Sequence, residues 1–71
     1  MDIFEFLRKT VHKLVGVPEE QILPESTKEE LNLDMFDVQE LVIDVEEEYD
    51  VLLPETGFET LGELESQVRA A

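Results

Sequence analysis

The hydrophobic residues near the start of the chain repeat with the spacing of a helix. They stand three, four and three residues apart, on one stripe of an amphipathic helix, at Phe4, Leu7, Val11 and Leu14. Asp2 is of a type that caps helix N-termini, and Gly16 and Pro18 are of types that end helices. The pattern therefore predicts a first helix within DIFEFLRKTVHKLVG, residues 2–16.

Residues 17–33 lack a helical repeat and predict a long connection between helices. Pro18 and Pro24 interrupt regular structure. Apolar anchors that could enter the core stand at Ile22, Leu31 and Leu33. The run Ser26-Thr27-Lys28-Glu29 fits the capping-box pattern, which predicts one short helical turn near residues 27–31. Connections of this length in so small a domain often carry function.

The second helix is predicted from about residue 35 to residue 49. Asp34 is a good N-cap residue, and Asp37 adds a second carboxylate at the positive end of the helix dipole. The core face of this helix has helical spacing and consists of Val38, Leu41, Val42, Val45 and Tyr49.

The last part of the chain predicts one more helix. Pro54 ends the extended segment VLLP, and ETGF at residues 55–58 leaves room for only a single turn. A second capping-box pattern at residues 60–63 opens the final helix, whose inward residues are Leu61, Leu64 and Val68. No segment alternates as a strand does. We expect one all-α domain over residues 1–71, with three principal helices and one or two single turns.

A second, narrower stripe remains on the helix at residues 35–49 once its core face is turned inward. It consists of Phe36, Gln39 and Ile43, and the residues that flank it are Asp37, Glu40, Asp44, Glu47 and Glu48. Apolar anchors surrounded by carboxylates are typical of a helix that enters a hydrophobic groove with a basic rim. Spacing alone fits equally well the alternative that Phe36 and Ile43 complete the edge of the core.

Charge is the strongest compositional signal. Nineteen acidic and five basic residues give the 71-residue chain a formal net charge of −14. Such a surface repels nucleic acid and anionic lipid and attracts basic protein patches. The chain has no cysteine, no apolar run near the ~18 residues of a membrane span and no signal-peptide layout. We therefore expect a soluble, monomeric, cytoplasmic protein without nucleic-acid or membrane partners.

The chain resembles the acyl carrier proteins over essentially its whole length. The matching motifs are Asp34-Met35-Phe36-Asp37, Glu40-Leu41, Glu46-Glu47-Glu48-Tyr49-Asp50 and Leu53-Pro54, with GVPEEQI and FETLGELESQV as weaker support. The resemblance implies a small four-helix bundle with a long first loop, an acidic second helix and a very short third helix. It also implies protein partners with basic patches, namely synthases, acyltransferases and a pantetheinyl transferase of fatty acid or polyketide metabolism.

Met35 departs from that family at its defining residue. In the family a serine at this place carries 4′-phosphopantetheine, and a thioether has no oxygen nucleophile with which to form the phosphodiester. The resemblance therefore implies that this chain carries no cofactor at the usual position. Asn32 stands where the family often has glycine, and Phe36 replaces the usual leucine. The segment before the last helix is about three residues short, which should reduce the third helix to one turn.

Three explanations of Met35 stay open. The serine was lost naturally in a divergent carrier-like protein, or it was replaced in the laboratory, or the resemblance is a coincidence of fold. The first favours an interaction or regulatory module that occupies a partner's basic patch without delivering substrate. Its partner-binding residues are expected to be Asp34, Met35, Phe36, Asp37, Gln39, Glu40, Ile43, Asp44 and Glu47.

The sequence gives little support for a metal site or for enzymatic activity. His12 has no cysteine or second histidine with which to share a metal, and the carboxylates at 29–30 and 46–48 form no calcium-loop pattern. We expect neither a metal site nor an enzyme. Besides the interaction module, two functions remain open: a working acyl carrier whose serine was substituted, and a small acidic inhibitor of an unrelated basic nuclease or toxin.

Overall fold

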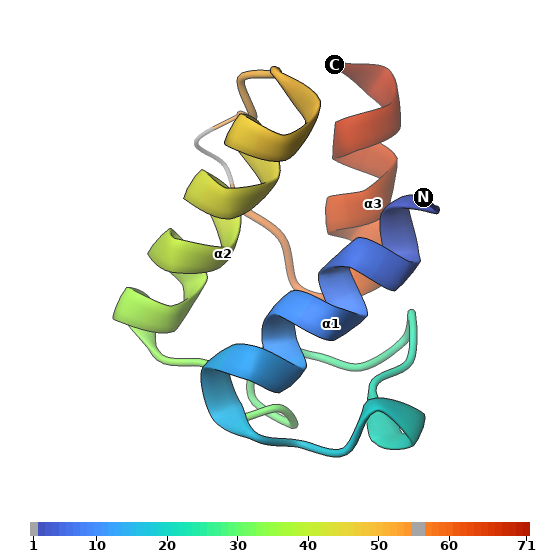
Figure 1. Ribbon diagram of the computed structural model, residues 1–71, viewed down its shortest axis with the longest axis vertical. Coiled ribbons are helices and arrows are strands. Elements are labelled where there is room, and N and C mark those ends of the chain that lie inside the picture. The colour runs from blue at the N-terminus through green and yellow to red at the C-terminus, as the bar shows by residue number, and fades with distance from the viewer. Residues whose placement is uncertain (1, 55–56) are drawn as a thin grey trace.

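The computed structural model describes residues 2–54 and 57–71. These residues form the helices α1 (Ile3–Val15), α2 (Met35–Tyr49) and α3 (Leu61–Ala70), with one 3-10 turn, η1 (Glu19–Gln21) (Figure 1). No strand occurs within them, so the all-α prediction is confirmed there. The three predicted helices also lie where the pattern placed them.

Helix α1 ends as predicted but begins differently. Gly16 adopts a left-handed conformation with φ of 77°, and its N–H donates to the carbonyl of His12, which is a common glycine ending. Asp2 occupies the N-cap position, yet its side chain accepts no capping hydrogen bond. Its carboxylate lies 3.6 Å from the guanidinium of Arg69 at the end of α3. Asp2 therefore contributes to joining the two helix ends and not to the predicted cap.

The connection between α1 and α2 contains two local structures. The first is η1, which the sequence pattern did not predict. The second is a turn in which the Leu31 N–H donates to the Thr27 carbonyl over 3.1 Å, as predicted. Its capping box joins Thr27 and Glu30 and not the predicted residues 26 and 29. Ser26 is instead buried and accepts a hydrogen bond from the backbone of Leu23.

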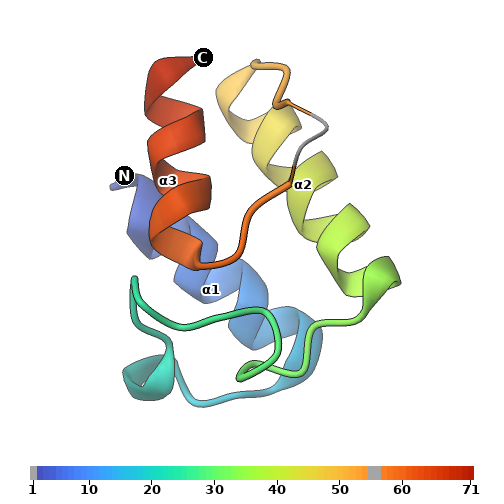
Figure 2. The same cartoon turned by 180° about the vertical axis from the view of Figure 1, so that it is seen from behind.

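Backbone hydrogen bonds attach this connection to the start of α3. The Lys28 N–H donates to the Glu59 carbonyl over 3.1 Å, and the Gly62 N–H donates to the Pro24 carbonyl over 2.8 Å. A Cβ at Gly62 would lie only 3.1 Å from that same carbonyl oxygen. Glycine thus permits the close approach of loop and helix. Figure 2 shows the loop running beneath α3.

The expected third helix, a single turn at residues 55–58, falls partly on residues outside those described. Between α2 and α3 the described residues, 51–54 and 57–59, contain no helix. The structure therefore establishes three α-helices in the described parts of the chain, and the four-helix arrangement stays a prediction.

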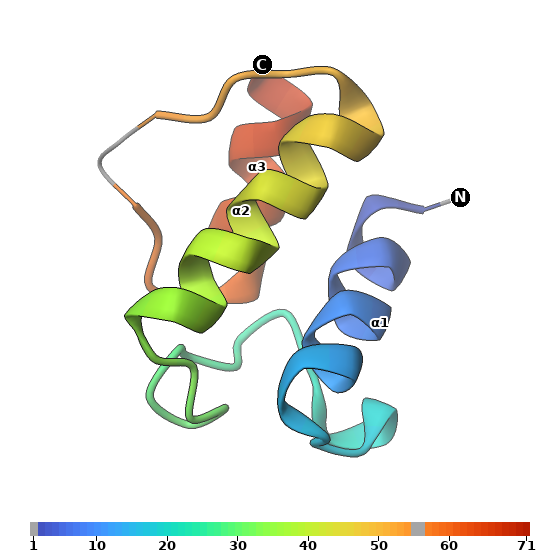
Figure 3. The same ribbon diagram turned by 60° about the vertical axis from the view of Figure 1, so that its left-hand side comes forward.

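The core lies between the three helices and the connection. Figure 3 shows α2 in front of α3, with α1 to the right of both. The buried apolar residues are Phe4, Leu7, Val11, Ile22, Leu31, Leu41, Val45, Phe58, Leu61, Leu64 and Val68. At the edge, Phe6 of α1 and Tyr49 of α2 meet edge to face with ring centroids 5.7 Å apart. Within the described residues, no helix is long and apolar enough to cross a membrane.

Candidate functional site: an exposed face of α2

The two apolar residues of the predicted second stripe on α2, Phe36 and Ile43, are exposed, and so is Met35 before them. Solvent reaches 75% of Phe36, 71% of Met35 and 49% of Ile43. Neither Phe36 nor Ile43 completes the edge of the core, as the alternative interpretation required. Large apolar side chains exposed to water mark a surface where covering by another molecule is favourable, because it lowers the free energy. We call Met35, Phe36, Gln39 and Ile43 the apolar stripe.

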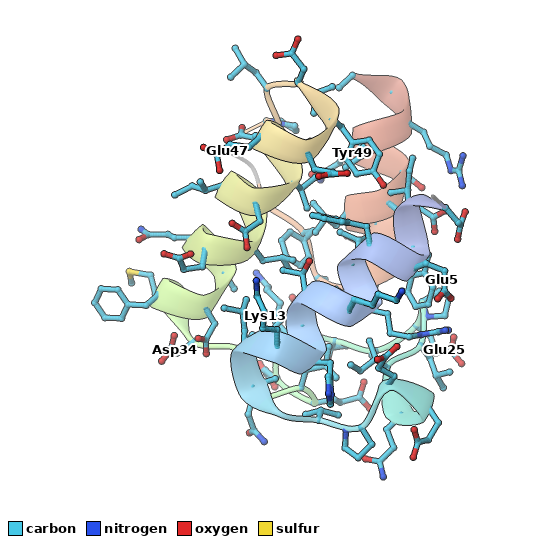
Figure 4. All side chains as sticks on the ribbon, viewed as in Figure 1. Glu5, Lys13, Glu25, Asp34, Glu47 and Tyr49 are labelled. Carbon is cyan, nitrogen blue, oxygen red and sulfur yellow. The ribbon has the colours of Figure 1, made fainter. Side chains whose placement is uncertain are left out.

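Helix geometry places five of the six carboxylates of α2 on one side of this stripe. Successive residues turn by about 100° around the axis, so the four stripe residues span an arc of roughly 100°. The next arc, pointing away from the core, holds five carboxylates that we call the acidic edge: Asp37, Glu40, Asp44, Glu47 and Glu48. Figure 4 shows Glu47 on the outer side of α2 and Asp34 at its start. These five carboxylates thus border the stripe along one edge instead of surrounding it, while Glu46 lines the groove on the other side.

The opposite edge of the stripe continues into an apolar groove. This open groove of about 650 Å³ lies between α2 and the segment that follows it. Its lining residues are Val38, Gln39, Val42, Ile43, Glu46, Leu52, Leu53, Pro54, Gly57 and Phe58. Leu52, 87% exposed, extends the apolar surface beyond α2. Leu52 could not be predicted from the sequence, because it stands in an extended segment without the periodicity that would distinguish an inward from an outward position.

Glu46 has a structural role at this groove. Its Oε2 accepts a hydrogen bond of 2.9 Å from the backbone N–H of Leu53. That bond joins the extended segment to α2 beside the groove, which both residues line. Of the acidic run at residues 46–48, Glu46 therefore serves the fold, while Glu47 and Glu48 are exposed.

Asp34 and Asp37 also serve the fold. The Asp34 carboxylate accepts from the Asp37 N–H over 2.8 Å, and the Asp37 carboxylate accepts from the Asp34 N–H over 3.3 Å. This reciprocal capping box fixes the start of α2. The two residues were predicted to bind a partner, and the structure shows both of them in the helix cap. The negative charges of these two residues still make the electrostatic potential more negative at the start of α2.

A second, smaller depression lies beside Met35. Its volume is about 440 Å³, and its lining residues are Lys28, Glu29, Leu33, Asp34, Met35, Val38, Gln39 and Glu59. Lys28 is the basic residue in this lining, and its ammonium lies 5.1 Å from the centroid of the Phe58 ring. This cation–π contact directs Lys28 toward the core segment rather than toward the acidic edge.

The start of α2 does not fit an attached 4′-phosphopantetheine. Attachment needs a hydroxyl, and α2 contains neither serine nor threonine. In the preceding loop, Ser26 is buried and bonded to Leu23, and the Thr27 hydroxyl belongs to its own capping box. These hydroxyls are committed to the fold, so neither of them offers an attachment point at the start of α2.

A metal centre finds no support in the described parts of the chain, where no group of three or more histidine and carboxylate side chains is placed to hold an ion. The ring Nδ1 of His12 lies 2.8 Å from the Val17 carbonyl oxygen, so this nitrogen already has a hydrogen-bonding partner at the end of α1. The face of α2 therefore offers apolar area and negative charge as its chemistry. No known protein-family model matches this chain.

Proposed function

We propose that this chain is an acyl-carrier-like interaction module that binds a basic-rimmed surface on an enzyme of acyl metabolism. The observation that carries the proposal is the exposure of Met35, Phe36 and Ile43 beside a continuous acidic edge. The order of helices and loops, and the motifs at residues 34–54, support the carrier-like part of the proposal. Met35 in place of serine supports a role without a cofactor.

The two parts of the face would contribute differently to binding. Burying a large apolar side chain stabilises a complex by about 1.5–3 kcal/mol, which makes Phe36 and Ile43 the main source of affinity. Charges at the rim act mostly on the association rate and on its salt dependence. Glu40, Asp44 and Glu47 would accordingly steer and orient a basic partner.

The carrier relationship is tested by restoring the hydroxyl. Met35→Ser, incubated with coenzyme A and a pantetheinyl transferase of broad specificity, should gain the mass of one phosphopantetheine. The parent chain is the control and should gain nothing. A folded Met35→Ser chain that stays unmodified would count against the relationship, because the transferase would then not read this helix as a carrier.

The interaction is tested by affinity capture from the lysate of the cell in which the chain occurs. Ile43→Glu introduces a charge into the apolar stripe and should abolish specific capture. Leu23→Glu is the matched control, since it adds the same charge at an exposed apolar residue outside α2. Acyl-metabolism enzymes that bind the parent and Leu23→Glu but not Ile43→Glu would support the proposal.

Two other results would contradict it. Capture of a basic nuclease or toxin through the same face would favour the inhibitor function. Identical protein sets on the parent and Ile43→Glu would mean that the apolar stripe binds nothing specific.

A further inference from the structure

Met35 is unusually accessible to solvent for a methionine. Its side chain is 71% exposed at the first residue of α2 and lies on the rim of the smaller depression. The chain has no cysteine and only one other methionine, Met1. Met35 therefore presents the one sulphur atom of the described residues to solvent, at the α2 N-terminal end of the surface proposed to bind partners.

We propose that Met35 is a reversible oxidation site through which peroxides control the apolar stripe. A sulphur lone pair attacks one oxygen of hydrogen peroxide, so that an S–O bond forms as the O–O bond breaks. The proton on the transferred oxygen passes to the departing hydroxide, which leaves as water. Sulphur is oxidised by two electrons and peroxide is reduced by two, giving methionine sulfoxide.

Oxidation of Met35 should not disturb the fold. The start of α2 is held by the reciprocal capping box of Asp34 and Asp37, and the nearest fully buried residue of the helix is Leu41. None of these contacts uses the Met35 side chain. The sulfoxide is therefore accommodated in water without loss of packing, so oxidation alters the surface and leaves the helix in place.

The consequence for binding rests on the proposed function. A sulfoxide oxygen is a strong hydrogen-bond acceptor, and a partner that covers Phe36 at the start of α2 would also cover its neighbour Met35. Burying this oxygen without a donor should weaken such binding by about tenfold. Reduction by the two methionine sulfoxide reductases, one for each sulfur epimer, would restore the apolar side chain.

The first experiment measures oxidation of the complete chain by intact mass and peptide mapping. We expect Met35 in the folded chain to take up one oxygen at a rate within about threefold of its rate in urea. The oxidised chain should keep its melting temperature and lose the oxygen again when both reductases are added. Met35→Leu, which retains an apolar side chain, is the control and isolates uptake at Met1.

Protection of Met35 by more than about tenfold on folding would overturn the proposal. Unfolding on oxidation would overturn it too, because the site would then be a lesion and not a switch.

The second experiment measures binding of a defined probe, a synthetic amphipathic helix of leucine and lysine. The reduced parent should bind it, Ile43→Glu should not, and oxidation should weaken binding by about tenfold in the parent but not in Met35→Leu. Equal binding before and after oxidation would overturn the switch while leaving the docking face intact. Failure of the reduced parent to bind would contradict the proposed function, and the oxidation rate would still decide the modification site.

Discussion

Asn32 and Asp50 both adopt backbone conformations that residues with a Cβ seldom occupy. Their φ angles are 58° and 54°. Asparagine and aspartate tolerate the left-handed region better than other residues with a side chain. Asparagine is therefore a residue type suited to the backbone at position 32. Asp50, by contrast, ends α2 at the negative pole of the helix dipole and close to the carboxylates of residues 46–48.

Asp50→Gly should therefore stabilise the protein. Glycine removes both the strain of the left-handed conformation and a charge of the wrong sign at the helix end. We expect the free energy of unfolding to rise by about 1 kcal/mol, measured as a higher urea midpoint. Asp50→Asn separates the two causes, because it removes only the charge and should give a smaller gain. A less stable Asp50→Gly chain would mean that Asp50 makes a favourable contact.

At the scale of the helix, there is a physical reason why some elements could be predicted from the sequence and others could not. Helices α1, α2 and α3 were predictable because each has a periodic core face and explicit signals at its ends, such as Asp34, Gly16 and Thr60. The turn η1 was missed because three residues give no periodicity. The first capping box was placed one residue early because Ser26 and Thr27 are equally good caps in sequence, and burial of Ser26 decides between them.

The candidate site was predictable only in part. The spacing of Phe36, Gln39 and Ile43 showed that they share a face, but not whether that face was buried. Exposure depends on which other elements cover α2, which is a tertiary property. Leu52 and the groove depend on how the extended segment folds back on the helix, and the hydrogen bond of Glu46 to Leu53 that holds it carries no sequence signature.

The acidic edge of α2 should control how fast partners associate. Reversing both Glu40 and Asp44 to lysine should slow association with the captured partner by about tenfold at low salt, with a much smaller effect at high salt. Surface plasmon resonance at two ionic strengths measures this. Lysine at Glu19 and Glu20 in η1 changes the net charge equally but away from α2, and should have little effect. Equal slowing by both pairs would show that net charge, and not the edge, governs association.

The contact between α1 and α2 predicts a loss of stability at alkaline pH. Burial, and then the negative charges of Glu48 and Asp2, raise the pKa of Tyr49 above its usual value of 10.0. A raised folded-state pKa means that the folded chain retains its proton longer than the unfolded chain. Stability is therefore unaffected below the unfolded pKa and falls as the pH rises above it.

Tyr49→Phe should remove this alkaline effect while keeping the ring packed against Phe6. Urea unfolding at about pH 9 and about pH 11 should show a smaller decrease in stability for the variant than for the parent. Tyr49 is the chain's single tyrosine, and there is no tryptophan. Its ionisation can therefore be followed directly by tyrosinate absorbance. Equal titration midpoints in the folded and the urea-unfolded chain would contradict the prediction.

At the scale of the whole molecule, charge is distributed very unevenly. Helix α2 carries six carboxylates and no basic side chain, while Arg8, Lys9 and Lys13 gather on α1. With a net charge of −14, the folded chain repels itself more than a neutral domain of this size would.

Salt should therefore stabilise the fold. Raising sodium chloride from about 0.01 M to about 1 M shortens the screening length from about 30 Å to about 3 Å. We expect the melting temperature to rise by about 4–8 °C, equivalent to about 1 kcal/mol, as measured by circular dichroism. Replacing Glu47 and Glu48 by glutamine should raise the melting temperature at low salt and reduce the response. A flat response in the parent would mean that the carboxylates are far enough apart to be screened by water alone.

The contact between Asp2 and Arg69 has a consequence for how the chain could be re-engineered. Because the Asp2 carboxylate lies 3.6 Å from the guanidinium of Arg69 in the last turn of α3, a peptide linker ligated between residues 2 and 69 or beyond would close the backbone into a ring. A ring removes conformational freedom from the unfolded chain alone, and for a loop of this length the gain is roughly 4 kcal/mol. The α2 face, whose first residues lie at the other end of the molecule in Figures 1 and 2, would remain open to its partners in the cyclised protein.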